Sequence, residues 1–119
     1  MTPINALQKL FEARDTIHFL HLNTTSYEVH KTLNKFYKEW IDLSDLFIET
    51  YQGKYGRISG SITIEANTNI NVLSYLSELM IFLNRELPAL LDDFDSDLEN
   101  IIADMKGLVN HTFYFLTLK

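Results

Sequence analysis

Side chains that could bind a metal ion gather between residues 18 and 49. His18 precedes and His30 follows the polar stretch Asn23-Thr24-Thr25, and the carboxylates of Asp45 and Glu49 lie further along the chain. Imidazole and carboxylate groups are ligands for transition metals such as iron, and carboxylates also bind hard cations. Asp45 and Glu49 are four residues apart, so on a helix they project from one face and together could chelate a cation.

The spacing of these groups decides how they could meet. His30 and Asp45 are 15 positions apart, which corresponds to roughly 22 Å along a straight helix that rises about 1.5 Å per residue. Because a metal–ligand bond is only about 2 Å long, one metal ion cannot bind both ends of the same helix. In a two-fold dimer with antiparallel second helices, His30 of one copy lies opposite Asp45 and Glu49 of the other. The spacing therefore predicts metal sites shared between two copies of the chain.

The apolar pattern predicts four helices that hold these residues. The strongest signal is a heptad seam in the second helix, formed by Val29, Leu33, Phe36, Trp40, Leu43 and Phe47. Capping boxes Thr25-x-x-Glu28 and Ser96-x-x-Glu99 predict the starts of the second and fourth helices. Pro88 should end or kink the third helix, because proline removes an interior hydrogen bond. The expected ranges are from residues 2–3 to about 24, from 25 to about 53, from about 69 to 87, and from 96 onward.

A change of composition separates the two helix pairs. Residues 53–70 contain Gly53, Gly56 and Gly60 and a β-branched patch from Ile58 to Ile64. We expect a long connection that returns the chain across the bundle, and a two-stranded hairpin within it would be marginal alone. A chain of 119 residues has room for one core. The expected fold is therefore all-α, a single four-helix-bundle domain over residues 1–119 with a long connection between helices 2 and 3.

Composition bounds the function classes. The chain has 10 Lys and Arg against 16 Asp and Glu, a net charge of −6, and no basic arm, so DNA binding is not expected. Cysteine is absent, which excludes thiolate zinc sites and cysteine nucleophiles. No apolar run approaches the length of a membrane span. The start Met1-Thr2-Pro3-Ile4-Asn5 lacks the pattern of a secretory signal, which favours the cytoplasm.

The stretch from His18 to Glu49 resembles the metal-site signature of the Dps-like (mini-ferritin) branch of the ferritin superfamily. The histidines at 18 and 30 and the carboxylates at 45 and 49 have the spacings of that family, and the text Ser26-Tyr27-Glu28-Val29-His30-Lys31-Thr32-Leu33-Asn34-Lys35-Phe36-Tyr37 is similar to its second-helix start. The resemblance implies a ferritin-like bundle with an iron site between two-fold related subunits. His18 and His30 would come from one subunit and Asp45 and Glu49 from the other. It further implies oxidation of Fe(II) by peroxide or oxygen, and iron storage in a hollow homo-oligomer, a dodecamer by resemblance.

This sequence departs from the family at Asn34. The family has an aspartate four residues after the second histidine, whereas asparagine offers a carbonyl oxygen without a charge, so we expect Asn34 to be a weak or indirect metal partner. His21 and Tyr37 lie close to the same stripe and are candidates for substitute ligands or electron donors as well as for core packing. No Glu-x-x-His motif occurs in the chain, which excludes the standard di-iron centre inside one bundle.

Two other interpretations remain open at this point. The chain could be a ferritin-fold protein that has lost iron oxidation and serves as a structural or interaction module, as Asn34 would favour. It could also be an unrelated helical bundle whose polar stripe forms a dimer interface.

Overall fold

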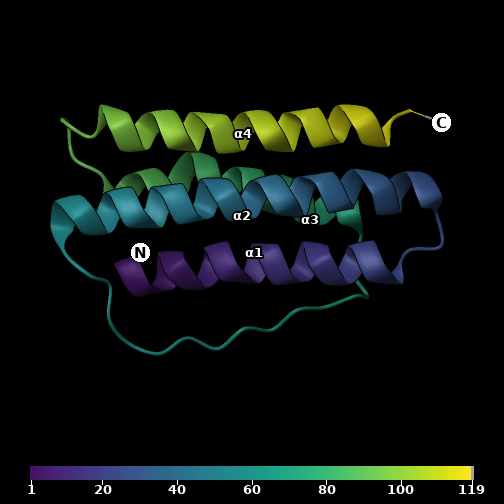
Figure 1. Cartoon of the computed structure of the whole chain (residues 1–119), viewed down its shortest axis with the longest axis horizontal. Helices are drawn as coiled ribbons and strands as arrows, with labels where there is room; N and C mark the ends of the chain where they lie inside the picture. The colour runs from purple at the N-terminus through teal and green to yellow at the C-terminus, as the bar shows by residue number, and fades with distance from the viewer. Residues whose placement is uncertain (119) are drawn as a thin grey trace.

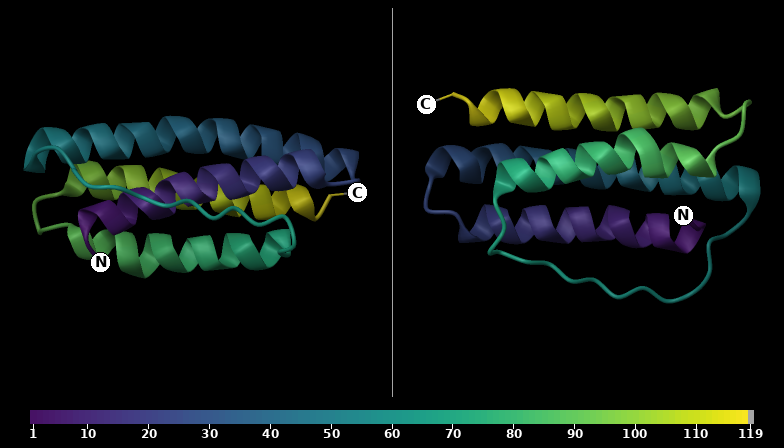
Figure 2. Two further views of the ribbon diagram at one scale, coloured as in Figure 1. Left: turned by 90° about the horizontal axis from the view of Figure 1, so that it is seen from below. Right: turned by 180° about the vertical axis from the view of Figure 1, so that it is seen from behind.

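The computed structural model describes residues 1–118, which form an elongated helical bundle of 43 × 27 × 20 Å (Figure 1). Its α-helices are α1 (Pro3–Asn23), α2 (Tyr27–Tyr55), α3 (Val72–Ile81) and α4 (Ser96–Leu116). α1 and α4 run in one direction and α2 and α3 in the other (Figures 1 and 2). The expected all-helical bundle is confirmed for the described residues. No helix among them is both long enough and apolar enough to cross a membrane.

The heptad seam of α2 forms the centre of the core. Leu33, Phe36 and Trp40 are fully buried and Phe47 nearly so, as the spacing predicts. The Trp40 indole N–H donates a hydrogen bond to the carbonyl of Leu10 at 3.0 Å. This bond fixes α2 against α1 at mid-length. The facing residues of the other helices include Ala13, Ile17, Leu76, Leu83, Leu98, Met105 and Val109.

The predicted capping boxes do not form. At α2 the N-cap is Ser26, whose hydroxyl accepts from the N–H of Val29 at 3.3 Å, so the cap lies one residue beyond Thr25. At α4 the N-cap is Asp95, and its side chain makes no capping bond. Ser96 is the first residue of α4 and therefore cannot be the N-cap of the predicted box. The carboxylate of Asp95, which occupies the N-cap position, accepts from Lys54 and Tyr55 at the end of α2 instead.

Proline sets the end of the third helix, as expected. Regular α-helix stops at Ile81, a π-helical turn covers Phe82–Glu86, and a 3-10 turn covers Leu87–Leu90. Within the π turn, the N–H of Leu87 donates to the carbonyl of Phe82. Pro88 has no N–H and its ring clashes with the carbonyl four residues before it, so the α-helical pattern cannot continue through it. The helix also begins three residues later than the sequence suggests, at Val72.

Residues 56–71 contain no helix and no strand, so no hairpin forms there. They follow an extended path alongside α1 (Figures 1 and 2). Ile62 and Ile64 are half-buried and alternate with exposed neighbours, and the N–H of Thr63 donates to the Gln8 side chain at 3.4 Å. Gly60 has a φ of 138°, and a Cβ there would lie 3.3 Å from the Ile4 side chain. Glycine is needed at this point both for the backbone angle and for the close approach.

Candidate functional site

Four aromatic rings meet where α1 ends and α2 begins. His18 and His21 come from the last turns of α1, and His30 and Tyr37 come from α2. His18 stacks on Tyr37 with ring centroids 4.3 Å apart, and His21 stacks on His30 at 4.0 Å. The centroids of His18 and His21 are 6.1 Å apart, so the two stacks form one cluster. The structure thus brings the two predicted histidine ligands to the same end of the bundle.

Reciprocal hydrogen bonds orient two of these histidines. His21 Nδ1 lies 2.7 Å from the carbonyl oxygen of His30, and His30 Nδ1 lies 2.8 Å from the carbonyl oxygen of His21. A carbonyl oxygen only accepts, so Nδ1 of each ring carries the proton. In the neutral imidazole Nε2 then keeps its lone pair. Metal-binding histidines commonly show this arrangement, in which the other ring nitrogen is held by a backbone carbonyl.

The short turn between the helices explains these bonds. The last four carbonyls of a helix lack an intrahelical partner. Of these in α1, the carbonyl of Leu20 accepts from the N–H of Thr24 at 3.1 Å, and the carbonyl of His21 accepts from the His30 ring. The His21 side chain itself is only 7% exposed. His21 therefore serves first as a structural residue of the turn, which is the core-packing role weighed for it from sequence.

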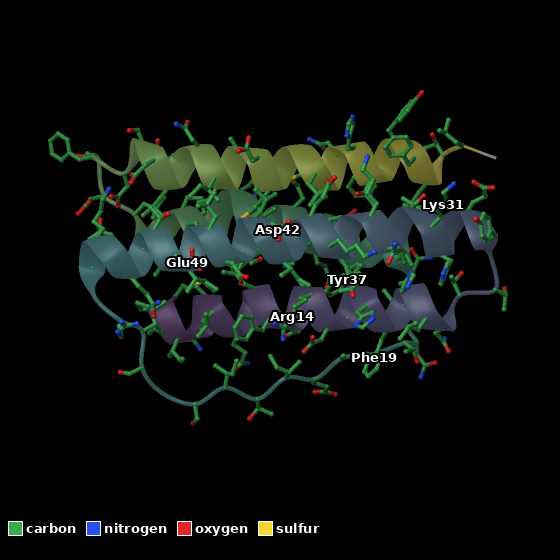
Figure 3. The ribbon with its side chains drawn as sticks, in the orientation of Figure 1. Arg14, Phe19, Lys31, Tyr37, Asp42 and Glu49 are labelled. Atoms are coloured by element: carbon green, nitrogen blue, oxygen red, sulfur yellow. The ribbon has the colours of Figure 1, made fainter. Side chains whose placement is uncertain are left out.

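The carboxylates lie elsewhere on α2. Asp45 and Glu49 are both exposed, and Figure 3 shows Glu49 far along the helix from Tyr37. Asn34 is half-buried and borders a groove toward α4. Within residues 1–118 of one chain, no group of three or more His, Asp or Glu side chains is placed to hold a metal ion. One copy thus assembles the histidine half alone, and the meeting of the two halves across a two-fold axis stays a prediction.

A second polar cluster joins the end of α2 to the start of α4. The Asp95 side chain is 2% exposed; Lys54 Nζ lies 2.6 Å from it, and Tyr55 donates its hydroxyl proton to it. The N–H of Asp92 adds a further bond at 2.9 Å. These donors lower the pKa of Asp95 to about 2, and the pKa of Lys54 is raised by its bonds to Asp95 and Asp97. The sequence does not predict this cluster, because Lys54 is some 40 positions away from the acidic residues 92–97.

A groove of about 480 Å³ runs between the first half of α2 and the last half of α4. Buried Phe36 and Leu108 lie beneath it, Phe115 and Leu118 line it with apolar surface, and Glu28, Lys31, Lys35 and Glu39 contribute charges of both signs. Lys35 Nζ lies 5.2 Å from the centre of the Phe115 ring, a cation–π distance. His111 is exposed and also lines this groove.

Comparison with known families finds a match over most of the chain. The model of a family of unknown function, DUF5856, matches residues 21–116. The chain belongs to this family. The matched range contains His21, His30, Asn34, Asp45 and Glu49, whereas His18 lies before it. No curated protein and no solved structure matches the chain. For this member of DUF5856, the residues themselves must therefore carry the functional argument.

Proposed function

We propose that the protein is a Dps-like iron-binding protein that oxidises Fe(II) at sites shared by two-fold related copies and stores the ferric product in a hollow oligomer. Its ligands are His18 and His30 of one copy and Asp45 and Glu49 of the other. Fe(II) and the oxidant, oxygen or peroxide, are both substrates. The cytoplasm, where Fe(II) is available, is the compartment that fits this activity.

Chain direction supports a ferritin-like fold for this proposal. α2 and α3 run in the same direction, so residues 56–71 must carry the chain along the length of the bundle (Figures 1 and 2). A bundle with one such long crossover is the ferritin-like arrangement, whereas simple up-down bundles use short loops throughout. α2 and α3 lie on opposite sides of the bundle, so the outer side of α2 is turned away from α3 (Figure 2).

The observation that carries the proposal is the state of His30. Its Nδ1 is committed to a backbone carbonyl, which leaves Nε2 as a lone-pair donor on a half-buried residue. The His30 ring stacks on His21, whose ring centroid lies 6.1 Å from that of His18. Asp45 and Glu49 stand exposed on one face of the same helix and form no salt bridge with any residue in the range 1–118. Neutral imidazole on one copy and free carboxylates on another together make the nitrogen and oxygen donor set that iron accepts.

Each group has a separate task. The histidines hold and orient Fe(II), and the carboxylates neutralise the charge that increases when Fe(II) becomes Fe(III). Each Fe(II) gives one electron to the oxidant. The net charge of −6 draws cations toward the molecule. Asn34 can support the site only through its carbonyl oxygen, which is why a protein that binds iron without oxidising it is the second candidate.

The test is the rate of Fe(II) oxidation in air, followed by ferric absorbance. His30→Asn removes the Nε2 ligand but can keep a donor toward the carbonyl of His21, so the fold should persist and the rate should fall to that of buffer. Asp45→Asn should do the same. His111→Asn, a matched change on α4, should leave the rate unchanged. A wild-type rate equal to buffer would refute the oxidase function and leave iron binding to be measured without oxygen.

A further inference from the structure

An exposed aromatic side chain stands on a hydrogen-bonded turn at one end of the bundle. Phe94 is 91% exposed and lies between Asp93 and Asp95 in the turn before α4. That turn is well fixed, because the N–H of Asp95 donates to the carbonyl of Asp92 at 3.2 Å and the N–H of Asp92 donates back to the Asp95 carboxylate at 2.9 Å. The fold therefore exposes the Phe94 ring to solvent on a turn whose backbone is hydrogen-bonded.

The groove between α2 and α4 has the complementary chemistry. Phe115 and Leu118 give it accessible apolar surface above the buried side chains of Phe36 and Leu108, with Lys31 and Lys35 beside it. Glu28 and Glu39 also line it, at the two ends of this stretch of α2, so the lysines occupy its middle. Neither lysine forms a salt bridge with another residue of the described part of the chain. Its volume of about 480 Å³ falls in the range of about 300–1,000 Å³ typical of binding pockets.

One chain cannot fill its own groove. The turn of Phe94 lies where α4 starts, and the groove lies beside His111 and Phe115 toward the other end of α4. From Ser96 to His111 the helix rises roughly 22 Å. Figure 3 places Lys31 at the end of the bundle opposite to this turn (compare Figure 1). The occupant that fits is therefore the same turn of a second copy.

We propose that Phe94 of one copy inserts into the α2–α4 groove of the next, with Asp92 and Asp93 facing Lys31 and Lys35. The apolar ring is covered by apolar surface, and the acidic turn meets the two unpaired lysines. This contact joins two different surfaces of the chain, so it is heterologous. Successive copies therefore add head to tail until they close into a ring. It differs from the two-fold contact of the iron proposal, which uses α1 and α2, and it does not require metal.

The first test is the mass of the assembly by sedimentation. Phe94→Ser should remove every species larger than the two-fold dimer, because the anchoring ring is gone. Ile81→Ser is the matched control, since Ile81 is 53% exposed on α3 and does not line the groove. Unchanged mass for Phe94→Ser, or a wild-type protein that never exceeds a dimer, would overturn the proposal. Retained iron oxidation in a Phe94→Ser dimer would separate this contact from the metal site.

The second test identifies the partner surfaces. Lys35→Glu should disrupt the assembly as Phe94→Ser does, and adding Asp93→Lys should restore it, because the charges are exchanged. Failure of the double variant to regain mass, with both single variants folded, would contradict the pairing. The chain has no cysteine, so Asp93→Cys with His111→Cys, which keeps the Phe94 ring and Asp92, can be oxidised to give a ladder of covalent multimers. Asp93→Cys with Leu73→Cys, which lies outside the groove, should give none.

Discussion

At the turn between α1 and α2, the hydrogen bond from the His30 ring to the carbonyl of His21 decides which ring nitrogen of His30 can bind a metal. His30 has the residue type and spacing of a ligand in sequence, but only the structure shows that its Nδ1 is held by the carbonyl of His21. The same carbonyl would otherwise lack a partner at the end of α1. One bond therefore completes the helix end and leaves Nε2 available. Sequence identified His18 and His30, whereas the pairing with His21 needed the geometry of the turn.

Asn34 is the position at which this chain departs from the Dps-like pattern, so a substitution there tests the proposed iron site. Asn34→Asp adds a carboxylate one helical turn from His30, so Fe(II) should bind more tightly, by about 10-fold or more if the effect matches that of other groups supporting metal sites. Anaerobic calorimetric titration with Fe(II) measures the change. Asn110→Asp adds the same charge on exposed α4 and is the control. Equal affinities for the two variants would show that position 34 does not act on iron.

At the scale of helices, periodic patterns were more informative than caps. The buried seam of α2 was predictable because each position is set by its own helix. The caps of α2 and α4 were not predictable in this way, because a cap residue can bond to other parts of the chain, as Asp95 does. Its carboxylate could have capped α4, but Lys54 and Tyr55 occupy it from the end of another helix. From sequence, Pro88 likewise predicts that the third helix ends or kinks, but it does not predict that the end takes the form of a π-helical turn.

The link between α2 and α4 should make stability depend on acid. The pKa of Asp95 is lowered to about 2 from an ordinary value of 3.8, first because Lys54 donates to its carboxylate and then because Tyr55 does. The unfolded chain takes up this proton more readily, so the contribution is complete above the ordinary pKa and is lost as the pH falls through about 2.

Thermal unfolding of wild type and Asp95→Asn measures this contribution. The wild type should have the higher Tm near neutral pH, and the difference should shrink as the pH falls from 3.8 through about 2. Asp104→Asn, an exposed change on α4, is the control and should show no such trend. A constant difference between wild type and Asp95→Asn across this range would mean that the ionised carboxylate is not what joins the two helices.

Across the whole molecule, the proposed iron site depends on the assembly of two copies. One copy holds its histidines where α1 ends and α2 begins and its carboxylates further along α2, and residues 1–118 of that copy do not bring them together. Sequence could predict this separation from the rise of a helix, but neither the sequence nor a single chain can position a second copy. The acidic surface is consistent with an oligomer that attracts cations, although charge alone does not choose iron.

Complementation between inactive copies tests whether the iron site is shared by two chains. His30→Asn protein and Asp45→Asn protein should each fail to oxidise Fe(II). When the two are unfolded together and refolded as a mixture, half of the dimers carry one copy of each kind. In such a dimer one of the two shared sites has both intact halves, so about a quarter of the wild-type rate should return. A mixture that stays as inactive as its separate components, with dimers shown to form, would contradict a site shared between copies.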